Sequence, residues 1–90
     1  MTTPVHHPGA HRFEATVDGH AGRLDYSVRG DDMTIVHTEV DPALEGKGVA
    51  GALVRAALDH ARASGLKVRA HCDYAASYMD RHPESLSLRA

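Results

Sequence analysis

The sequence predicts an α/β domain with a single twisted mixed sheet of about four strands, one long crossover helix and a short C-terminal helix. Three observations lead to this fold class. Apolar and polar residues alternate in several short runs bounded by turn-forming residues, which is typical of strands. One longer segment carries its apolar residues at helical spacing. Another alternating run follows that helix, so the strands on either side of it should be parallel, with a right-handed crossover.

Two alternating runs near the N-terminus predict a hairpin. Asp18-Gly19 lies between them, and glycine adopts the positive φ of a tight turn without steric cost. Gly30 turns the chain again after the second run. The residues expected to share one face of each strand are Phe13, Ala15 and Val17 in the first run and Leu24, Tyr26 and Val28 in the second.

The third run, residues 33–40, has apolar side chains on both faces. By the period of two, Met33 and Ile35 point one way, and Val36 and Val40 point the other way. This pattern predicts a central strand that is covered on both sides. A proline follows the run and lacks the ladder donor, so the strand should end there.

The long helix is expected to begin near Val49 and to end at Gly65, which can adopt a left-handed conformation. Its apolar stripe comprises Val49, Ala50, Leu53, Val54, Ala57, Leu58 and Ala61. A fourth strand is expected over residues 66–72. A short helix should then run from Tyr74 to about Arg81, and we expect the rest of the chain to be a frayed tail.

Ninety residues make one domain. Residues 1–10 contain two prolines and a glycine and show no periodicity, so they predict a flexible N-terminal arm. The remaining residues, 11–90, form the expected single domain.

Composition and charge exclude several classes of function. The formal net charge is −2 and the basic residues are dispersed, whereas nucleic-acid binding needs a clustered basic face. No apolar run approaches the ~20 residues that cross a bilayer. The single cysteine, Cys72, fits a reducing compartment, so we expect a cytoplasmic protein without nucleic-acid or membrane partners. The eight histidines lack metal-ligand spacing, so no metal site is expected.

The segment most informative about function is DPALEGKGVAGAL, residues 41–53, where a central strand leads into the long helix. It contains Gly46, Gly48 and Gly51. The first amides of a helix lack intrahelical partners and, together with the helix dipole, favour an anion. Glycine lets a phosphate oxygen approach the backbone without meeting a Cβ. The segment therefore predicts a binding site for a pyrophosphate.

Two other phosphate-binding loops fit less well. The ATP-type loop, G-x-x-x-x-G-K-[ST], is absent from this segment. The dinucleotide fingerprint G-x-G-x-x-G is formally present from Gly46 to Gly51. However, it comes after the third strand, and no complete second strand–helix–strand half follows it.

Residues 45–50, EGKGVA, resemble the [QR]-x-x-G-x-[GA] acetyl-CoA loop of the GNAT N-acetyltransferase superfamily, with Glu45 in place of Gln or Arg. The wider chain resembles the short single-domain branch of that superfamily. Members carry H-T-x-V-x-P-x-L-x-G-K-G before a helix, then a strand ending in cysteine and a short helix ending in H-P. The matching residues are HTEVDPALEGKG at 37–48, then Cys72 and His82-Pro83. The resemblance covers about residues 12–84.

The resemblance implies a minimal GNAT-like fold that binds acetyl-CoA, with coenzyme A as cosubstrate and no metal. The pantetheine arm would pass between the third and fourth strands and pair with backbone groups near residues 37–40. The pyrophosphate would bind amides at the start of the helix. The cofactor-binding residues that it implies are Val40, Glu45, Gly46, Lys47, Gly48, Val49, Ala50 and Gly51.

Cys72 is a candidate catalytic residue, because a thiol beside a helix N-terminus can have a lowered pKa and act as a nucleophile. It would take acetyl from the thioester in a two-step mechanism, or line the acyl pocket. The alternative is a small buried apolar residue, since Cys72 shares a face with Leu66, Val68 and Ala70.

Direct attack by an amine needs a base and a proton donor for the leaving thiolate. His37 and Glu39 share a face of the third strand and are both candidate bases, or else a structural histidine and a solvated carboxylate. Tyr74 and Tyr78 share a face of the last helix. In the superfamily a tyrosine near this helix often protonates the departing sulfur. Tyr78 is the better-aligned candidate, and a core tyrosine is the alternative.

We therefore expect an acetyl-CoA-dependent N-acetyltransferase that moves acetyl to a small amine or peptide acceptor, directly or through Cys72. The first alternative is a non-catalytic acyl-CoA-binding or sensing module. The second is a protein-interaction domain whose glycines are purely structural. A monomer or weak homodimer is expected.

Overall fold

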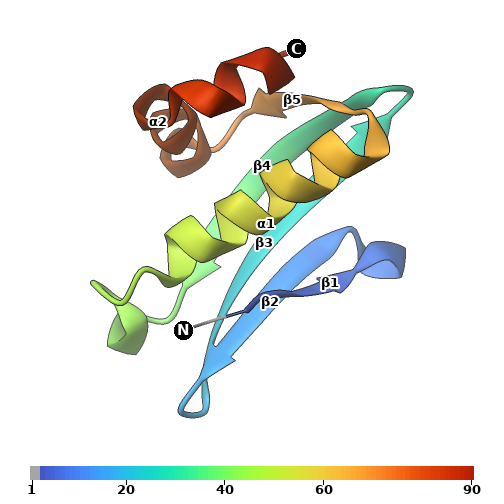
Figure 1. The fold of residues 1–90 in the computed structure, drawn as a ribbon. Coiled ribbons are helices and arrows are strands. Elements are labelled where there is room, and N and C mark those ends of the chain that lie inside the picture. The colour runs from blue at the N-terminus through green and yellow to red at the C-terminus, as the bar shows by residue number, and fades with distance from the viewer. Residues whose placement is uncertain (1–2) are drawn as a thin grey trace.

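The computed structural model describes residues 3–90. Five strands form one sheet in chain order, with antiparallel neighbours except for the parallel pair β4 and β5. Figure 1 shows α1 lying across one face of this sheet and α2 packed near β5. The strands are β1 (Val5–His7), β2 (Arg12–Val17), β3 (His20–Arg29), β4 (Asp32–Val40) and β5 (Lys67–Ala70). The helices are α1 (Val49–Ser64) and α2 (Asp73–Arg81), with short 3-10 helices η1 (Pro8–Ala10), η2 (Pro42–Leu44) and η3 (Pro83–Leu88).

The predicted α/β class, mixed sheet and crossover helix are confirmed, but the expected number of strands was too small. The fifth strand, β1, lies within the predicted flexible arm, residues 1–10, of which Met1 and Thr2 lie outside the described residues. Tertiary contacts hold β1: the His6 ring stacks on Phe13 at 4.2 Å, and His6 Nε2 lies 2.6 Å from Tyr26 Oη. Local periodicity could not reveal a strand of three residues that depends on such contacts.

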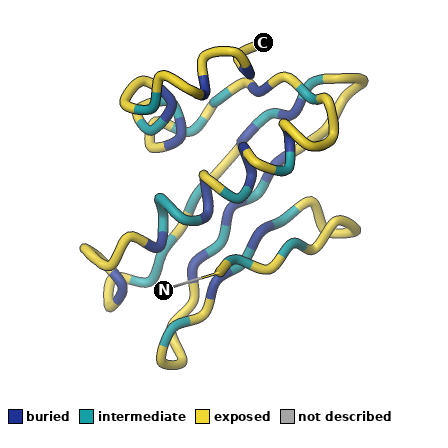
Figure 2. The backbone as a smooth tube through the Cα atoms, in the orientation of Figure 1, coloured by how far each residue is buried: buried dark blue, intermediate teal, exposed yellow. Residues whose placement is uncertain are grey.

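The apolar stripe of α1 packs against the sheet as predicted, except that Ala50 is only half-buried. Figure 2 shows the buried residues of α1 on the side that faces the strands. The helix ends at Gly65, whose φ is 71° and whose N–H donates to the Ala61 carbonyl. Each fully buried Leu or Val contributes roughly 1.5–3 kcal/mol, so this stripe fixes the helix on the sheet. The buried members are Val49, Leu53, Val54, Ala57, Leu58 and Ala61.

The prediction that β4 is covered on both faces was wrong. Met33 and Ile35 are fully buried under α1, but Val36 is 51% exposed. The register between β3 and β4 shifts at this point: Asp25 pairs with His37, whereas Tyr26 pairs with Ile35. Val36 is thus an extra residue, a β-bulge, and it reverses the alternation of all residues that follow it in the strand.

After the bulge, Thr38 and Val40 lie on the same face as Ile35, because they pair with Leu24 and Gly22 on the α1 side of the sheet. His37 and Glu39 lie on the opposite face. No helix of residues 3–90 packs on that face in Figure 1. We call it the open face of the sheet.

The residues after α2 form a packed segment rather than the expected frayed tail. Ser85 and Leu88 are buried, and Ser85 Oγ donates to the carbonyls of Met79 and His82 at 3.1 and 2.7 Å. The Ala90 N–H donates to the Val68 carbonyl at 3.0 Å, so the segment covers part of the outer edge of β5. A short sequence with two serines and two leucines gave no periodic signal for this packing.

Candidate functional site

A groove of about 440 Å³ lies between the end of β4 and the start of α1. It is open to solvent along one side and has both apolar walls and backbone groups. The residues lining it come from β4, the connecting loop, α1 and α2. They are Thr38, Val40, Leu44, Glu45, Gly46, Gly48, Val49, Ala50 and Tyr74.

The groove exists because β4 and β5 separate. Their parallel pairing extends only to Ile35 and Ala70, followed by one bond from the His71 N–H to the Ile35 carbonyl at 3.0 Å. β4 continues to Val40, whereas β5 has already ended. Among the described residues, no strand pairs with this last part of β4 on the β5 side. A ligand with amide groups could therefore add to the free edge of β4.

The loop that enters α1 is shaped by a short 3-10 helix and two glycines. The Asp41 side chain begins η2 by accepting a hydrogen bond from the Ala43 N–H at 2.9 Å. This bond, followed by the contact with His20, holds the pKa of Asp41 below its ordinary value. Gly46 and Gly48 then have φ of 77° and 76°, a left-handed conformation that favours glycine. The chain thereby turns directly into the first residue of α1.

This turn leaves a set of amides without partners. The first intrahelical bond of α1 runs from the Ala52 N–H to the Gly48 carbonyl at 3.0 Å. Within residues 3–90, five preceding amides donate to no backbone carbonyl. They belong to Gly46, Gly48, Val49, Ala50 and Gly51. Such amides at a helix N-terminus form a site for an anion.

The structure brings six of the eight predicted cofactor-binding residues to the groove, and two lie differently. The Lys47 N–H already donates to the Leu44 carbonyl at 3.1 Å, so it is engaged within the chain. Gly51 faces α2: a methyl group placed on it would stand 3.4 Å from Tyr74 Oη and 3.7 Å from Tyr78 Cε2. The six that line the groove are Val40, Glu45, Gly46, Gly48, Val49 and Ala50.

Cys72 is the N-cap residue of α2 and lies next to the groove. Its Sγ is 3.6 Å from the hydroxyl of Thr38, which lines the groove. Burial raises the pKa of Cys72, but neighbouring donor groups favour the thiolate and bring the pKa below its ordinary value. The groups that favour the thiolate are the amide of Ala75, the hydroxyl of Thr38, and the amides of Tyr74 and Thr38, of which the Thr38 hydroxyl makes a direct contact with the sulfur. The structure thus gives Cys72 the surroundings of a nucleophilic thiol.

The two candidate tyrosines of α2 have different surroundings. Tyr74 lines the groove and is 38% exposed. Tyr78 lies one turn further along and stacks on His82 at 3.8 Å, away from the groove walls. Burial raises the pKa of Tyr78. Tyr74 is therefore the tyrosine nearer to a ligand in the groove.

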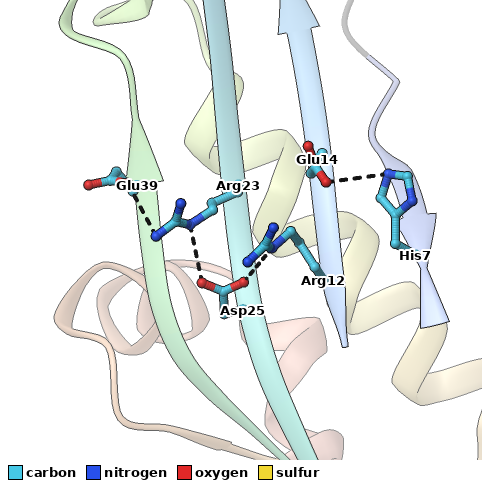
Figure 3. A network of polar contacts seen from close by, with 6 residues as sticks. All are labelled: His7, Arg12, Glu14, Arg23, Asp25 and Glu39. Atoms are coloured by element: carbon cyan, nitrogen blue, oxygen red, sulfur yellow. Dashed lines mark hydrogen bonds and ion pairs between the residues drawn. The ribbon is translucent and has the colours of Figure 1, made fainter. Parts of the chain in front are cut away.

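His37 and Glu39 lie together on the open face, as their shared strand face predicts, but on the side of β4 opposite to the groove-lining Thr38. Figure 3 shows Glu39 within a row of charged side chains that crosses the sheet. Arg23 Nη2 lies 3.5 Å from Glu39 Oε2, and Arg23 Nε lies 3.2 Å from Asp25 Oδ2. Among the described residues, His37 has no ion pair and no side-chain hydrogen bond.

The groove, its free amides and the neighbouring thiol can be compared with those of known proteins. The sequence model of the family described as GCN5-related N-acetyl-transferase matches residues 12–88. The chain belongs to this family. The match spans the sheet from β2 onward, both α-helices, the loop of free amides and Cys72.

Solved structures agree with this family assignment at the level of the fold. The GCN5-related chain is similar to a protein from Staphylococcus aureus described as GCN5-like, whose structure was determined in solution by NMR. The TM-score is 0.74 at 24% sequence identity, over 97% of this chain and 86% of that one. An acetyltransferase from Trypanosoma brucei is also similar, with a TM-score of 0.56 at 18% identity. That match covers 92% of this chain and 66% of the other.

Sequence reasoning missed two groove residues of this GCN5-related protein. Thr38 was hidden because the bulge at Val36 reverses the alternation on which face assignments depend. Tyr74 was named only as the helical neighbour of Tyr78, since the spacing puts both on one face and cannot rank them.

The described residues contain no group of three or more histidine, cysteine or acidic side chains that could hold a metal. Nor does this part of the chain contain a helix long and apolar enough to span a membrane.

Proposed function

We propose that this protein binds acetyl-CoA in the groove between β4 and α1 and transfers the acetyl group to an amine. The observation that carries this proposal is the run of five free amides at the start of α1, joined by a groove to the thiol of Cys72. Membership of an N-acetyltransferase family supports the reaction class.

The amides of Gly46, Gly48 and Val49 are suited to the pyrophosphate of coenzyme A. They are unpaired, they lie at the positive end of the α1 dipole, and a Cβ placed on either glycine would meet no other part of the chain within 4 Å. The carboxylate of Glu45 is exposed and can point into solvent, away from a bound anion. This arrangement explains how a loop without Gln or Arg at position 45 can accept a diphosphate.

The free edge of β4 is suited to the pantetheine arm. Its amides would pair with the backbone beside Thr38 and Val40, where β5 has left the sheet. An arm lying there would run from the amides of α1 toward Cys72. We therefore place the acetyl thioester next to the Cys72 sulfur.

The position of Cys72 favours transfer in two steps. In the first step, the Cys72 thiolate forms a bond to the acetyl carbonyl carbon, the bond from that carbon to the coenzyme A sulfur breaks, and the released thiolate takes a proton. Tyr74 is the proposed proton donor because it lines the groove. In the second step, an amine nitrogen attacks the Cys72 thioester, loses a proton to a base, and releases the Cys72 thiolate.

His37 is the proposed base for the amine. Both His37 and Glu39 lie on the open face, but Glu39 is held by Arg23 at 3.5 Å. A histidine that has no ion pair and no side-chain hydrogen bond in the described residues has both ring nitrogens available to an acceptor amine. The acceptor amine would accordingly approach from the open face and reach the thioester through the opening where β5 has left the sheet.

Thermal shift with coenzyme A tests the binding proposal, since a ligand that binds only the folded state stabilises it by RT ln(1 + [L]/Kd). We expect a concentration-dependent rise in Tm for the wild type and a reduced rise for Gly48→Val, which crowds the amides. Gly9→Ala is the matched control, because Gly9 has open space around its Cα and lies far along the chain from the groove. No rise at millimolar ligand would refute the proposal.

Intact mass after incubation with acetyl-CoA tests the two-step route. The wild type should gain one acetyl group that hydroxylamine removes, as expected of a thioester, and Cys72→Ala should not. Release of coenzyme A in the presence of amines distinguishes an enzyme from a module that only binds or senses acyl-CoA. A Cys72→Ala variant that acetylates amines at the wild-type rate would show that transfer is direct.

A further inference from the structure

The β-bulge at Val36 determines which side chain faces Cys72. With uninterrupted alternation, residues 37 and 39 would share the buried face with Met33 and Ile35. The extra residue instead brings Thr38 to the α1 side, opposite Leu24. Bulges often redirect a side chain next to a functional site. Here the redirected side chain is the hydroxyl nearest to the thiol.

Thr38 and Cys72 form a side-chain contact across the point where the two strands separate. The Cys72 S–H donates toward Thr38 Oγ1 at 3.6 Å, within hydrogen-bonding distance for sulfur. The last pair of the β4–β5 ladder, Ile35 and Ala70, lies directly before this point. The contact therefore fixes the thiol relative to the free edge of β4.

A hydroxyl can serve both protonation states of the sulfur. It accepts a hydrogen bond from a thiol and, after rotation about the Cβ–Oγ1 bond, donates one to a thiolate. The amides near the sulfur, from Thr38, Tyr74 and Ala75, can only donate. The groups that lower the pKa of Cys72 are these amides and the Thr38 hydroxyl. The Thr38 hydroxyl is thus the only neighbouring side chain among these contributions.

We propose that Thr38 is a positioning residue that holds the Cys72 sulfur at the groove and stabilises its thiolate. This inference rests on the proposed function, in which the Cys72 thiolate takes the acetyl group. When Cys72 loses its proton to solvent, the hydroxyl reverses its hydrogen bond and the sulfur stays in place. Thr38 itself neither gives up nor receives a proton in either step of the transfer.

The rate of alkylation of Cys72 by iodoacetamide tests this role, because Cys72 is the only cysteine of the chain and only its thiolate reacts. Intact mass would be followed over a range of pH for the wild type, Thr38→Val and Thr38→Ser. Valine keeps the β-branched shape and removes the hydroxyl, whereas serine keeps the hydroxyl. Cys72→Ala serves as the unreactive control.

We expect the midpoint of the Thr38→Val profile to move up by about one pH unit, equivalent to about tenfold slower alkylation below the midpoint. Thr38→Ser should stay within about threefold of the wild type. A Thr38→Val profile that coincides with that of the wild type, in a protein with native circular dichroism, would overturn the proposal. Equal shifts for valine and serine would also overturn it, since packing would then control the thiol.

Coenzyme A binding by the same variants separates this inference from the proposed function. Alkylation needs no ligand, so a shifted Thr38→Val profile supports the role of Thr38 even if no protein of the series binds coenzyme A. In that case the proposed function fails and the positioning of the thiol stands. If the proteins bind coenzyme A but the Thr38→Val profile does not shift, the binding proposal stands and the role of Thr38 fails.

Discussion

Gly22 of β3 lies under Val49, the first residue of α1. A methyl group placed on Gly22 would stand 3.1 Å from Val49 Cγ1, 3.2 Å from Val40 Cγ2 and 3.3 Å from Leu53 Cδ1. Both valines also line the groove. The absence of a side chain at Gly22 therefore sets how closely the start of α1 approaches the sheet, and with it the distance from the free amides to β4.

Gly22→Ala should destabilise the fold by about 1–3 kcal/mol, because an extra methyl in a packed core forces its neighbours to move. It should also weaken coenzyme A binding, since both walls of the groove shift. Chemical denaturation and titration with coenzyme A measure the two effects. Gly9→Ala, at a position with open space, should leave both quantities near their wild-type values. Unchanged affinity in Gly22→Ala would show that the groove does not depend on this packing.

Gly48 before α1 and Gly51 within α1 should respond differently to alanine. Gly48→Ala should cost about 1–2 kcal/mol, because φ at Gly48 is 76° and side chains are disfavoured there. Gly51→Ala should stabilise by roughly 0.5–1 kcal/mol, since alanine is the better helix former. Its methyl would face Tyr74 and Tyr78 at ordinary contact distances, so coenzyme A affinity should stay within about threefold. Thermal unfolding and coenzyme A titration of the two variants check these expectations.

A cluster of rings around His6 should make stability depend on pH. Burial, followed by His60, His7 and His11, lowers the pKa of His6 from 6.5. Below pH 6.5 the unfolded chain therefore binds more protons than the folded chain. The contribution of His6 to stability is complete above pH 6.5 and falls as the pH decreases toward the folded-state pKa.

His6→Phe keeps a ring stacked on Phe13 but cannot be protonated. Its Tm should decrease less between about pH 7.5 and 5.5 than that of the wild type. His7→Phe is a useful comparison, because His7 pairs with Glu14 on the open face at 3.5 Å and makes a smaller contribution than burial or His60 to the lowered pKa of His6. Equal pH dependence in wild type and His6→Phe would show that His6 does not couple to folding.

Substitutions on the open face should separate the two candidate bases. His37→Gln should slow acetylation of an amine by about 100-fold and allow the acetyl-Cys72 thioester to accumulate. Glu39→Gln should change stability by no more than about 0.5 kcal/mol, as is usual for an exposed ion pair, and should leave the rate within about threefold. Amine product and protein mass, followed over time, report both steps. A larger loss of rate in Glu39→Gln than in His37→Gln would assign the base to Glu39.

Much of the fold could be predicted because local patterns and tertiary packing agree. The stripe from Val49 to Ala61 had only one reasonable partner, the sheet, and Gly65 ended the helix where its left-handed conformation was expected. Gly46 and Gly48 likewise indicated that backbone amides of the loop form a binding site. These features depend on residue spacing alone, and spacing can be read directly from the sequence.

The parts that could not be predicted depend on contacts between distant residues. β1 is held by His6 against Phe13 and Tyr26, on strands further along the chain. The bulge at Val36 arises from how β4 pairs with β3, so the sequence of β4 alone assigns Thr38 to the wrong face. For the same reason the neighbourhood of Cys72 became visible only in three dimensions.

The bulge also makes β4 unusually sensitive to a change in length. Deletion of Val36 would restore uninterrupted alternation and interchange the two surfaces of the second half of the strand. Thr38 and Val40 would turn toward solvent, and His37 and Glu39 would turn toward α1. A deletion of one codon would thus exchange a neutral groove wall for an ionisable one, while the sequence of every other element stayed the same.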